Sequence, residues 1–110
     1  MNDNKIGLDE LRPIADIDLA IHSPARLKIL AFLQVVESAD FTFLMNQTGL
    51  TRGNLSSHLS KLEEVGYVSI NKEFVDRVPR TLISLTDEGQ AAIHTYRENM
   101  KQVLEEILAS

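Results

Sequence analysis

Residues 51–67, TRGNLSSHLSKLEEVGY, constrain the fold of this 110-residue chain more than any other stretch. Thr51 can cap a first helical turn through its hydroxyl. Gly66 stands where a left-handed residue would end the helix. Between these two residues the apolar side chains recur at helical spacing and form a narrow stripe at Leu55, Leu59 and Leu62. The stretch therefore predicts one capped helix that is anchored along a single face.

The opposite face of this helix is small and polar, and it carries no acid before Glu63 and Glu64. Its outward positions are Gly53, Asn54, Ser57, Ser60 and Lys61. An ordinary solvated helix would carry long charged side chains of both signs at such positions. Short hydrogen-bonding groups suit close approach to a flat polar surface, such as the base edges in a DNA major groove. Simple exposure to solvent is the alternative interpretation.

Two helices are expected before this stretch, after a loose polar tail over residues 1–7. Apolar residues from Leu8 to Ile21 approximate a helical stripe, with Pro13 near its start. Ser23 is a good cap and Pro24 fits the first position of a second helix. That second helix, residues 24–36, is apolar nearly all round, as is typical of a buried helix.

A helix-turn-helix is the arrangement expected in the middle of the chain. Residues 41–43 could form a very short strand, and residues 44–48 a short helix that ends at Gly49. The longer polar-faced helix then follows, and a short helix, a glycine-containing turn and a longer helix in this order are typical of the motif. After Gly66 the apolar period changes to two, which predicts a hairpin. Its strands cover residues 68–71 and 80–85 and are joined by a loop at residues 72–79.

The last helix is expected over residues 87–108, with Thr86 as its cap and two acids at its positive end. Its apolar seam is Ile93, Tyr96, Met100, Val103, Leu104 and Ile107, widened by Leu108. Little chain remains to cover this seam, so we expect it to pair with the same helix of a second subunit. Packing on the first helix of the same chain is the alternative, and the width of the stripe allows both.

Length and composition limit the remaining possibilities. A chain of this length suits one domain over residues 1–110. It has no cysteine, so disulfides, thiolate metal sites and cysteine nucleophiles are excluded, and a reducing cytoplasm fits. No apolar run has the length of about 20 residues that a membrane span needs, and the polar N-terminus does not resemble a signal peptide.

Charge is distributed unevenly along the chain. The net charge is −5, which argues mildly against a nucleic-acid partner. Residues 51–82, however, carry five Lys or Arg residues and four Asp or Glu residues, so only this segment is not acidic. Any binding to phosphates should therefore be moderate and strongly salt-dependent.

The order of elements is that of a winged helix-turn-helix, mainly α with a small β-hairpin and with extended terminal helices for dimerisation. The chain resembles the small winged-helix transcriptional regulators of the MarR (multiple antibiotic resistance) and ArsR (arsenical resistance) groups. Three segments carry this resemblance, at residues 22–30, 54–68 and 85–89. It implies a homodimer that binds double-stranded DNA, with recognition helices in successive major grooves and wings on the flanking DNA. The predicted DNA-binding residues are Arg52, Asn54, Ser56, Ser57, Ser60 and Lys61 on the helix, and Arg77 and Arg80 on the wing.

Other functions receive less support from the sequence. His58 lies at the edge of the apolar stripe and is expected to be half-buried and to fix the helix orientation; a phosphate contact is its alternative role. His94 and Glu98 have a spacing that can hold a metal ion, but two ligands do not make a site. No catalytic set or cofactor motif is visible, so we expect neither an enzyme nor a cofactor. A protein-interaction module is the alternative function, and the resemblance allows an effector pocket between the final helices and the DNA-binding body.

Overall fold

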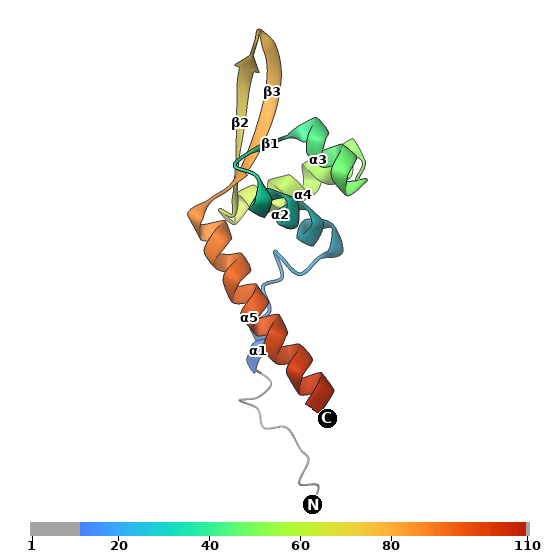
Figure 1. Ribbon diagram of the computed structural model, residues 1–110, viewed down its shortest axis with the longest axis vertical. Coiled ribbons are helices and arrows are strands. Elements are labelled where there is room, and N and C mark those ends of the chain that lie inside the picture. The colour runs from blue at the N-terminus through green and yellow to red at the C-terminus, as the bar shows by residue number, and fades with distance from the viewer. Residues whose placement is uncertain (1–11, 110) are drawn as a thin grey trace, which may run out of the picture.

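The computed structural model describes residues 12–109, so the predicted tail over residues 1–7 lies outside the described residues. In chain order the elements are α1 (Arg12–Ala15), α2 (Pro24–Val35), β1 (Ala39–Asp40), α3 (Phe41–Thr48), α4 (Arg52–Glu64), β2 (Val68–Val75), β3 (Val78–Leu85) and α5 (Asp87–Ala109). The β2–β3 hairpin extends from one side of a small helical body, and α5 extends in the opposite direction (Figure 1). This is the winged helix-turn-helix architecture that the sequence predicts.

One apolar core joins α2, α3, α4 and the base of the sheet to the start of α5. Its fully buried side chains are Ile21, Ile29, Leu44, Leu55, Leu59, Leu62 and Ile83. The three leucines of α4 lie on one face, as their spacing predicts. The predicted all-round burial of α2 is only partly right, because Leu27 is 37% exposed on the side that faces α5.

The sheet has three antiparallel strands in the order β1-β3-β2. The predicted strands at residues 68–71 and 80–85 are too short, and the predicted loop at 72–79 is wrong, because β2 and β3 continue to a turn at Asp76 and Arg77. Both turn residues have positive φ, 52° and 68°. This conformation matches the right-handed twist of a tight two-residue hairpin, although neither residue is the glycine that usually marks such a turn. The wing is therefore a long, regular hairpin.

A second correction concerns the start of the helix-turn-helix. The predicted strand at residues 41–43 is wrong, because the strand is Ala39–Asp40 and α3 already begins at Phe41. The physical reason is a cap: the Asp40 carboxylate accepts a hydrogen bond from the Phe43 amide at 2.7 Å. The two residues of β1 pair with the wing instead, with Ala39 opposite Ile83.

The predicted helix over residues 8–21 is also much shorter in the described part of the chain, where α1 covers only Arg12–Ala15. Beyond it the chain turns, and the Asp18 side chain accepts a hydrogen bond from the Ala20 amide at 2.9 Å. Such a bond from an aspartate to nearby backbone competes with a helix. The short α1 lies against α5 (Figure 1).

Helix α5 begins and runs as predicted. The Thr86 hydroxyl accepts a hydrogen bond from the Gly89 amide at 2.9 Å and donates one to the Gly66 carbonyl at 2.5 Å. The Thr86 amide also donates to the Tyr67 carbonyl at 3.1 Å. The first turn of α5 is thus hydrogen-bonded to the residues immediately after α4.

Candidate nucleic-acid interface

Helices α3 and α4 are joined by a tight turn. Gly49 adopts the left-handed conformation, with φ of 73°, and its amide bonds to the Met45 carbonyl at 3.1 Å. Thr51 then caps α4, because its hydroxyl accepts a hydrogen bond from the Asn54 amide at 3.2 Å. Both signals were expected from the sequence, and together they set the direction of α4.

The outward face of α4 is open. All six predicted DNA-binding residues of this helix are exposed, namely Arg52, Asn54, Ser56, Ser57, Ser60 and Lys61. The side chains on the opposite face, Leu55, Leu59 and Leu62, are 2% exposed or less. The helix therefore presents short polar groups to solvent on a rigidly anchored scaffold.

A groove of about 610 Å³ lies between α4 and the wing. Three of the predicted α4 residues line it, Arg52, Ser56 and Ser60. Lys72 and Arg80 of the hairpin line its other side. The guanidinium of Arg52 lies over the Phe41 ring, 5.4 Å from its centroid. The groove thus brings three cations together with the hydroxyls of Ser56 and Ser60, from α4 and from the hairpin.

The remaining predicted residues lie outside this groove. Asn54, Ser57 and Lys61 are exposed on α4, and Arg77 is exposed at the tip of the hairpin. Arg80 differs from the others because it is ion-paired: its Nη1 lies 2.6 Å from Oδ2 of Asp40. No local pattern singles out Asp40, because its partner Arg80 lies 40 residues further along the chain.

His58 is half-buried, as predicted. Its Nδ1 lies 3.1 Å from Nη1 of Arg26, and because a guanidinium only donates, Nδ1 is the acceptor and the neutral ring carries its proton on Nε2. Burial, followed by the positive charges of Arg26 and Lys61, lowers the pKa of His58 below its ordinary value of 6.5. These surroundings therefore favour the neutral form of His58.

Arg26 was not predicted to be important, yet it connects α4 to the chain before α2. Its Nε donates to the Ala20 carbonyl at 2.5 Å and its Nη2 to the Leu19 carbonyl at 3.2 Å. No local pattern could reveal these contacts, because Arg26 and His58 are 32 residues apart. Arg26 fixes the orientation of the recognition helix from the side that faces away from the groove.

A second hydrogen bond to the segment before α2 lies just after the end of α4. The Tyr67 hydroxyl donates to Oδ2 of Asp18 at 2.5 Å. This hydrogen bond, burial and the charges of Asp18 and Glu88 raise the pKa of Tyr67 to about 12. The segment before α2 is thus bonded directly to the turn after α4 through Asp18, and indirectly to the middle of α4 through Arg26.

The predicted dimer seam divides into two parts. Ile93, Tyr96 and Val103 are buried within their own chain, with exposed fractions of 8–9%. Leu104, Ile107 and Leu108 are 52%, 61% and 84% exposed. Met100 lies between these groups, half-buried, and lines an apolar groove of about 490 Å³ between α2 and α5 together with Leu27 and Leu104.

His94 and Glu98 are both exposed on α5. Among residues 12–109, no three His, Cys, Asp or Glu side chains gather closely enough to hold a metal ion. In the same part of the chain, no helix is long and apolar enough to cross a membrane.

The structure contains a capped helix with a small polar outward face, a short helix packed before it and a hairpin with cations beside it. Together these elements define a winged-helix DNA-binding protein. Comparison with known proteins agrees. Residues 25–104 match the family of winged helix DNA-binding domains, and the chain belongs to that family.

Similar proteins support the same assignment. The structure of a transcriptional regulator homologue from Pyrococcus horikoshii OT3 is 33% identical, with a TM-score of 0.80 over 91% of this chain and 98% of that one. The uncharacterized protein MJ0432 of Methanocaldococcus jannaschii is 37% identical over 78% of this chain and 94% of its own length. The transcriptional repressor CouR, whose structure contains a 23-mer DNA duplex, is 27% identical, with a TM-score of 0.63 over 87% of this chain and 63% of its own. This chain is a DNA-binding transcriptional regulator, and its resemblance to winged-helix regulators is confirmed.

Proposed function

We propose that the chain acts as a homodimer that binds a palindromic operator, with the outward face of α4 reading bases and the wing contacting phosphates. The observation that carries this proposal is the groove between α4 and the hairpin. Arg52, Ser56 and Ser60 of the recognition helix line it together with Lys72 and Arg80 of the wing. Hydroxyl groups suit base edges and phosphate oxygens, and cations suit phosphates.

The groups outside the groove extend the same surface. Asn54 and Ser57 are exposed near the N-terminal end of α4, where a recognition helix enters the major groove. Arg77 is exposed at the apex of the wing. In this arrangement Asn54 and Ser57 contribute to sequence preference, while Arg77 contributes affinity for DNA of any sequence. A regulator of this kind works in the compartment that holds the chromosome, and we keep the cytoplasmic location expected from the sequence as part of the proposal.

Selection of duplexes from a random pool tests the proposal, because a recovered palindrome reports specificity and symmetry together. The affinity for the selected duplex is then measured by fluorescence anisotropy across a salt series. Asn54→Ala should change the preferred bases at one position, by about 1–3 kcal/mol of discrimination. Arg77→Ala should weaken binding to all sequences alike and lower the salt slope by about 2, roughly 1 for each subunit of the dimer. Equal affinity for all duplexes at every salt concentration would refute sequence-specific binding. No binding to any duplex would leave the protein-interaction module as the better hypothesis.

The dimer proposal rests on the exposed part of the α5 seam. Leu104 and Leu108 are 52% and 84% exposed, next to the apolar groove against α2. A contiguous apolar surface of this kind is typical of an interface between subunits. The half-sites of a palindrome should then lie about one DNA turn (roughly 10 bp), or a multiple of it, apart.

Analytical ultracentrifugation of Leu104→Glu tests this interface. The variant should sediment as a monomer at concentrations where the wild type is a dimer, because a carboxylate would be buried against apolar side chains. Thr95→Glu is the matched control, since Thr95 is exposed on the opposite side of α5 and gains the same charge. Dimers of both variants with unchanged stability would refute the seam. We expect a small apolar effector to bind in the apolar groove between α2 and α5. Its binding would be detected as dissociation of the protein from DNA.

A further inference from the structure

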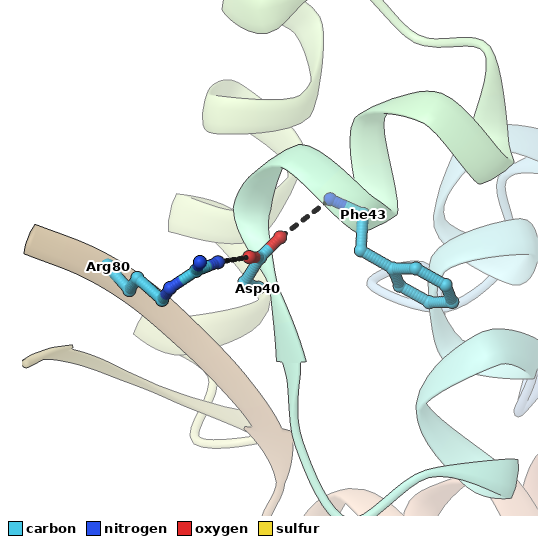
Figure 2. A network of polar contacts seen from close by, with 3 residues as sticks. All are labelled: Asp40, Phe43 and Arg80. Carbon is cyan, nitrogen blue, oxygen red and sulfur yellow. Dashed lines mark hydrogen bonds and ion pairs between the residues drawn. The ribbon is translucent and has the colours of Figure 1, made fainter. Parts of the chain in front are cut away.

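Asp40 is bonded at both carboxylate oxygens. Oδ1 accepts a hydrogen bond from the Phe43 amide at 2.7 Å, which caps α3. Oδ2 lies 2.6 Å from Nη1 of Arg80 on β3. Figure 2 shows the carboxylate between the first turn of α3 and the wing. One side chain therefore joins the beginning of the helix-turn-helix to the hairpin.

The two partners differ in their exposure to solvent. The Asp40 side chain is 22% exposed, whereas that of Arg80 is 46% exposed. A guanidinium has five N–H donors, and the contact with Asp40 uses Nη1 only. The other donors of Arg80 are available to an anion, and both residues line the groove that contains Arg52 and Ser60.

This arrangement has two opposite effects on DNA binding. A carboxylate 2.6 Å from the guanidinium reduces its attraction for a phosphate and repels that phosphate directly. The same ion pair restricts Arg80 to one orientation relative to α4, because Asp40 is itself fixed by the cap of α3. An arginine held in this way reaches a phosphate only when the DNA lies at one position relative to α4. That position is the one in which the bases of the operator are in register with the recognition helix.

The charge of Asp40 is not needed for the cap of α3. Asparagine and serine cap helices about as well as aspartate does. The residue at this position therefore adds a negative charge to the protein's DNA-binding side that the cap alone does not require.

We propose that Asp40 is a positioning residue that acts through Arg80: it lowers the affinity for DNA of any sequence and raises the preference for the operator over other sequences. The inference rests on the proposed function of the groove between α4 and the wing. It assigns to the contact between α3 and the wing a part in specificity, in addition to its part in folding.

The test uses Asp40→Asn and Asp40→Ser, which remove the charge and keep a capping oxygen. Binding is measured by fluorescence anisotropy on the duplex recovered by selection and on a scrambled duplex of roughly 30 bp, enough for two half-sites. Both variants should bind the scrambled duplex about threefold to tenfold more tightly at low salt. The salt slope should be steeper by up to about 1.8, the value for one additional phosphate per subunit of the dimer (about 0.9 each). The ratio of selected to scrambled affinity should fall.

Three controls separate this role from a structural one. Glu64→Gln removes an exposed acid at the end of α4 and changes the net charge equally, but should leave the affinity ratio unchanged. Asp40→Asn combined with Arg80→Ala should lose the steeper slope seen with Asp40→Asn alone. Urea unfolding should show midpoints near that of the wild type for both neutral caps, so that binding changes are not changes in folding.

The outcomes are distinguishable. If Asp40→Asn and Asp40→Ser keep the salt slope and the affinity ratio of the wild type, or bind both duplexes more weakly, the role of Asp40 is refuted while the proposed function stands. If the wild type binds neither duplex, the proposed function fails and the role of Asp40 fails with it.

Discussion

Replacing Gly89 by alanine tests how α5 is attached to the DNA-binding body. Gly89 is buried in the first turn of α5. A Cβ atom added there would lie 2.9 Å from the carbonyl carbon and 3.0 Å from the Cα of Tyr67, and closer still to the carbonyl oxygen. These are backbone atoms, so no side chain can rotate away, and α5 must move off the segment that follows α4.

Two effects of opposite sign decide the magnitude. Alanine is favoured over glycine in a helix by about 0.5–1 kcal/mol. Overpacking a tight site costs about 1–3 kcal/mol, and a clash with backbone belongs at the upper end of that range. We therefore expect Gly89→Ala to lower the free energy of unfolding by about 2 kcal/mol, which for a domain of this size lowers Tm by about 8–16 °C.

Gly53→Ala is the matched control, because Gly53 also lies in the first turn of a helix and nothing lies within 4 Å of its added Cβ. It should stabilise the protein by up to about 1 kcal/mol. Thermal and urea unfolding of both variants, followed by circular dichroism at equal protein concentration, measures the difference. A Gly89→Ala variant as stable as Gly53→Ala would refute the close packing of α5 on Tyr67.

Three further predictions concern the anchors of α4. Leu59→Ala should destabilise the protein by about 2–5 kcal/mol in urea unfolding, because Leu59 is 2% exposed. Tyr67→Phe should lower the free energy of unfolding by about 1–2 kcal/mol at pH 7, because the hydrogen bond to Asp18 is lost. Since the pKa of Tyr67 is raised to about 12, the wild type should also lose stability as the pH rises above 10. The variant should lack this part of the pH dependence. Because the pKa of His58 is lowered, the unfolded chain binds protons more readily, so stability should fall as the pH drops below 6.5, and His58→Gln should remove that part of the dependence.

The elements that were predicted well have local signals. Ser23, Thr51 and Thr86 each cap the helix that follows, and each accepts the expected bond from a backbone amide. The period of the apolar residues also changes where α4 gives way to β2. Such signals depend on a few adjacent residues, so they can be read from one sequence.

The features that were missed depend on residues distant in sequence. The pairing of Ala39 with Ile83 creates a strand from two residues that have no strand pattern of their own. The bond between Arg26 and His58 and the ion pair between Asp40 and Arg80 likewise require the finished fold. The exposure of the outward face of α4 could be predicted because outward positions follow from the helical period, but the ion pair between Arg80 and Asp40 could not.

The contacts that hold α4 leave its outward face free. His58 receives its bond from Arg26, and the segment after α4 is bonded through Tyr67 to Asp18 and through Gly66 to the cap of α5. In contrast, Asn54, Ser57 and Ser60 are exposed, and their side chains have no part in these bonds.

Substitutions at exposed positions of this kind usually change stability by less than about 0.5 kcal/mol. The proposed base-reading residues on the outward face of α4 can therefore be varied with little effect on folding. A change at Asp18, Arg26 or Tyr67 would instead reduce stability and alter the placement of all the side chains on the outward face of α4 together.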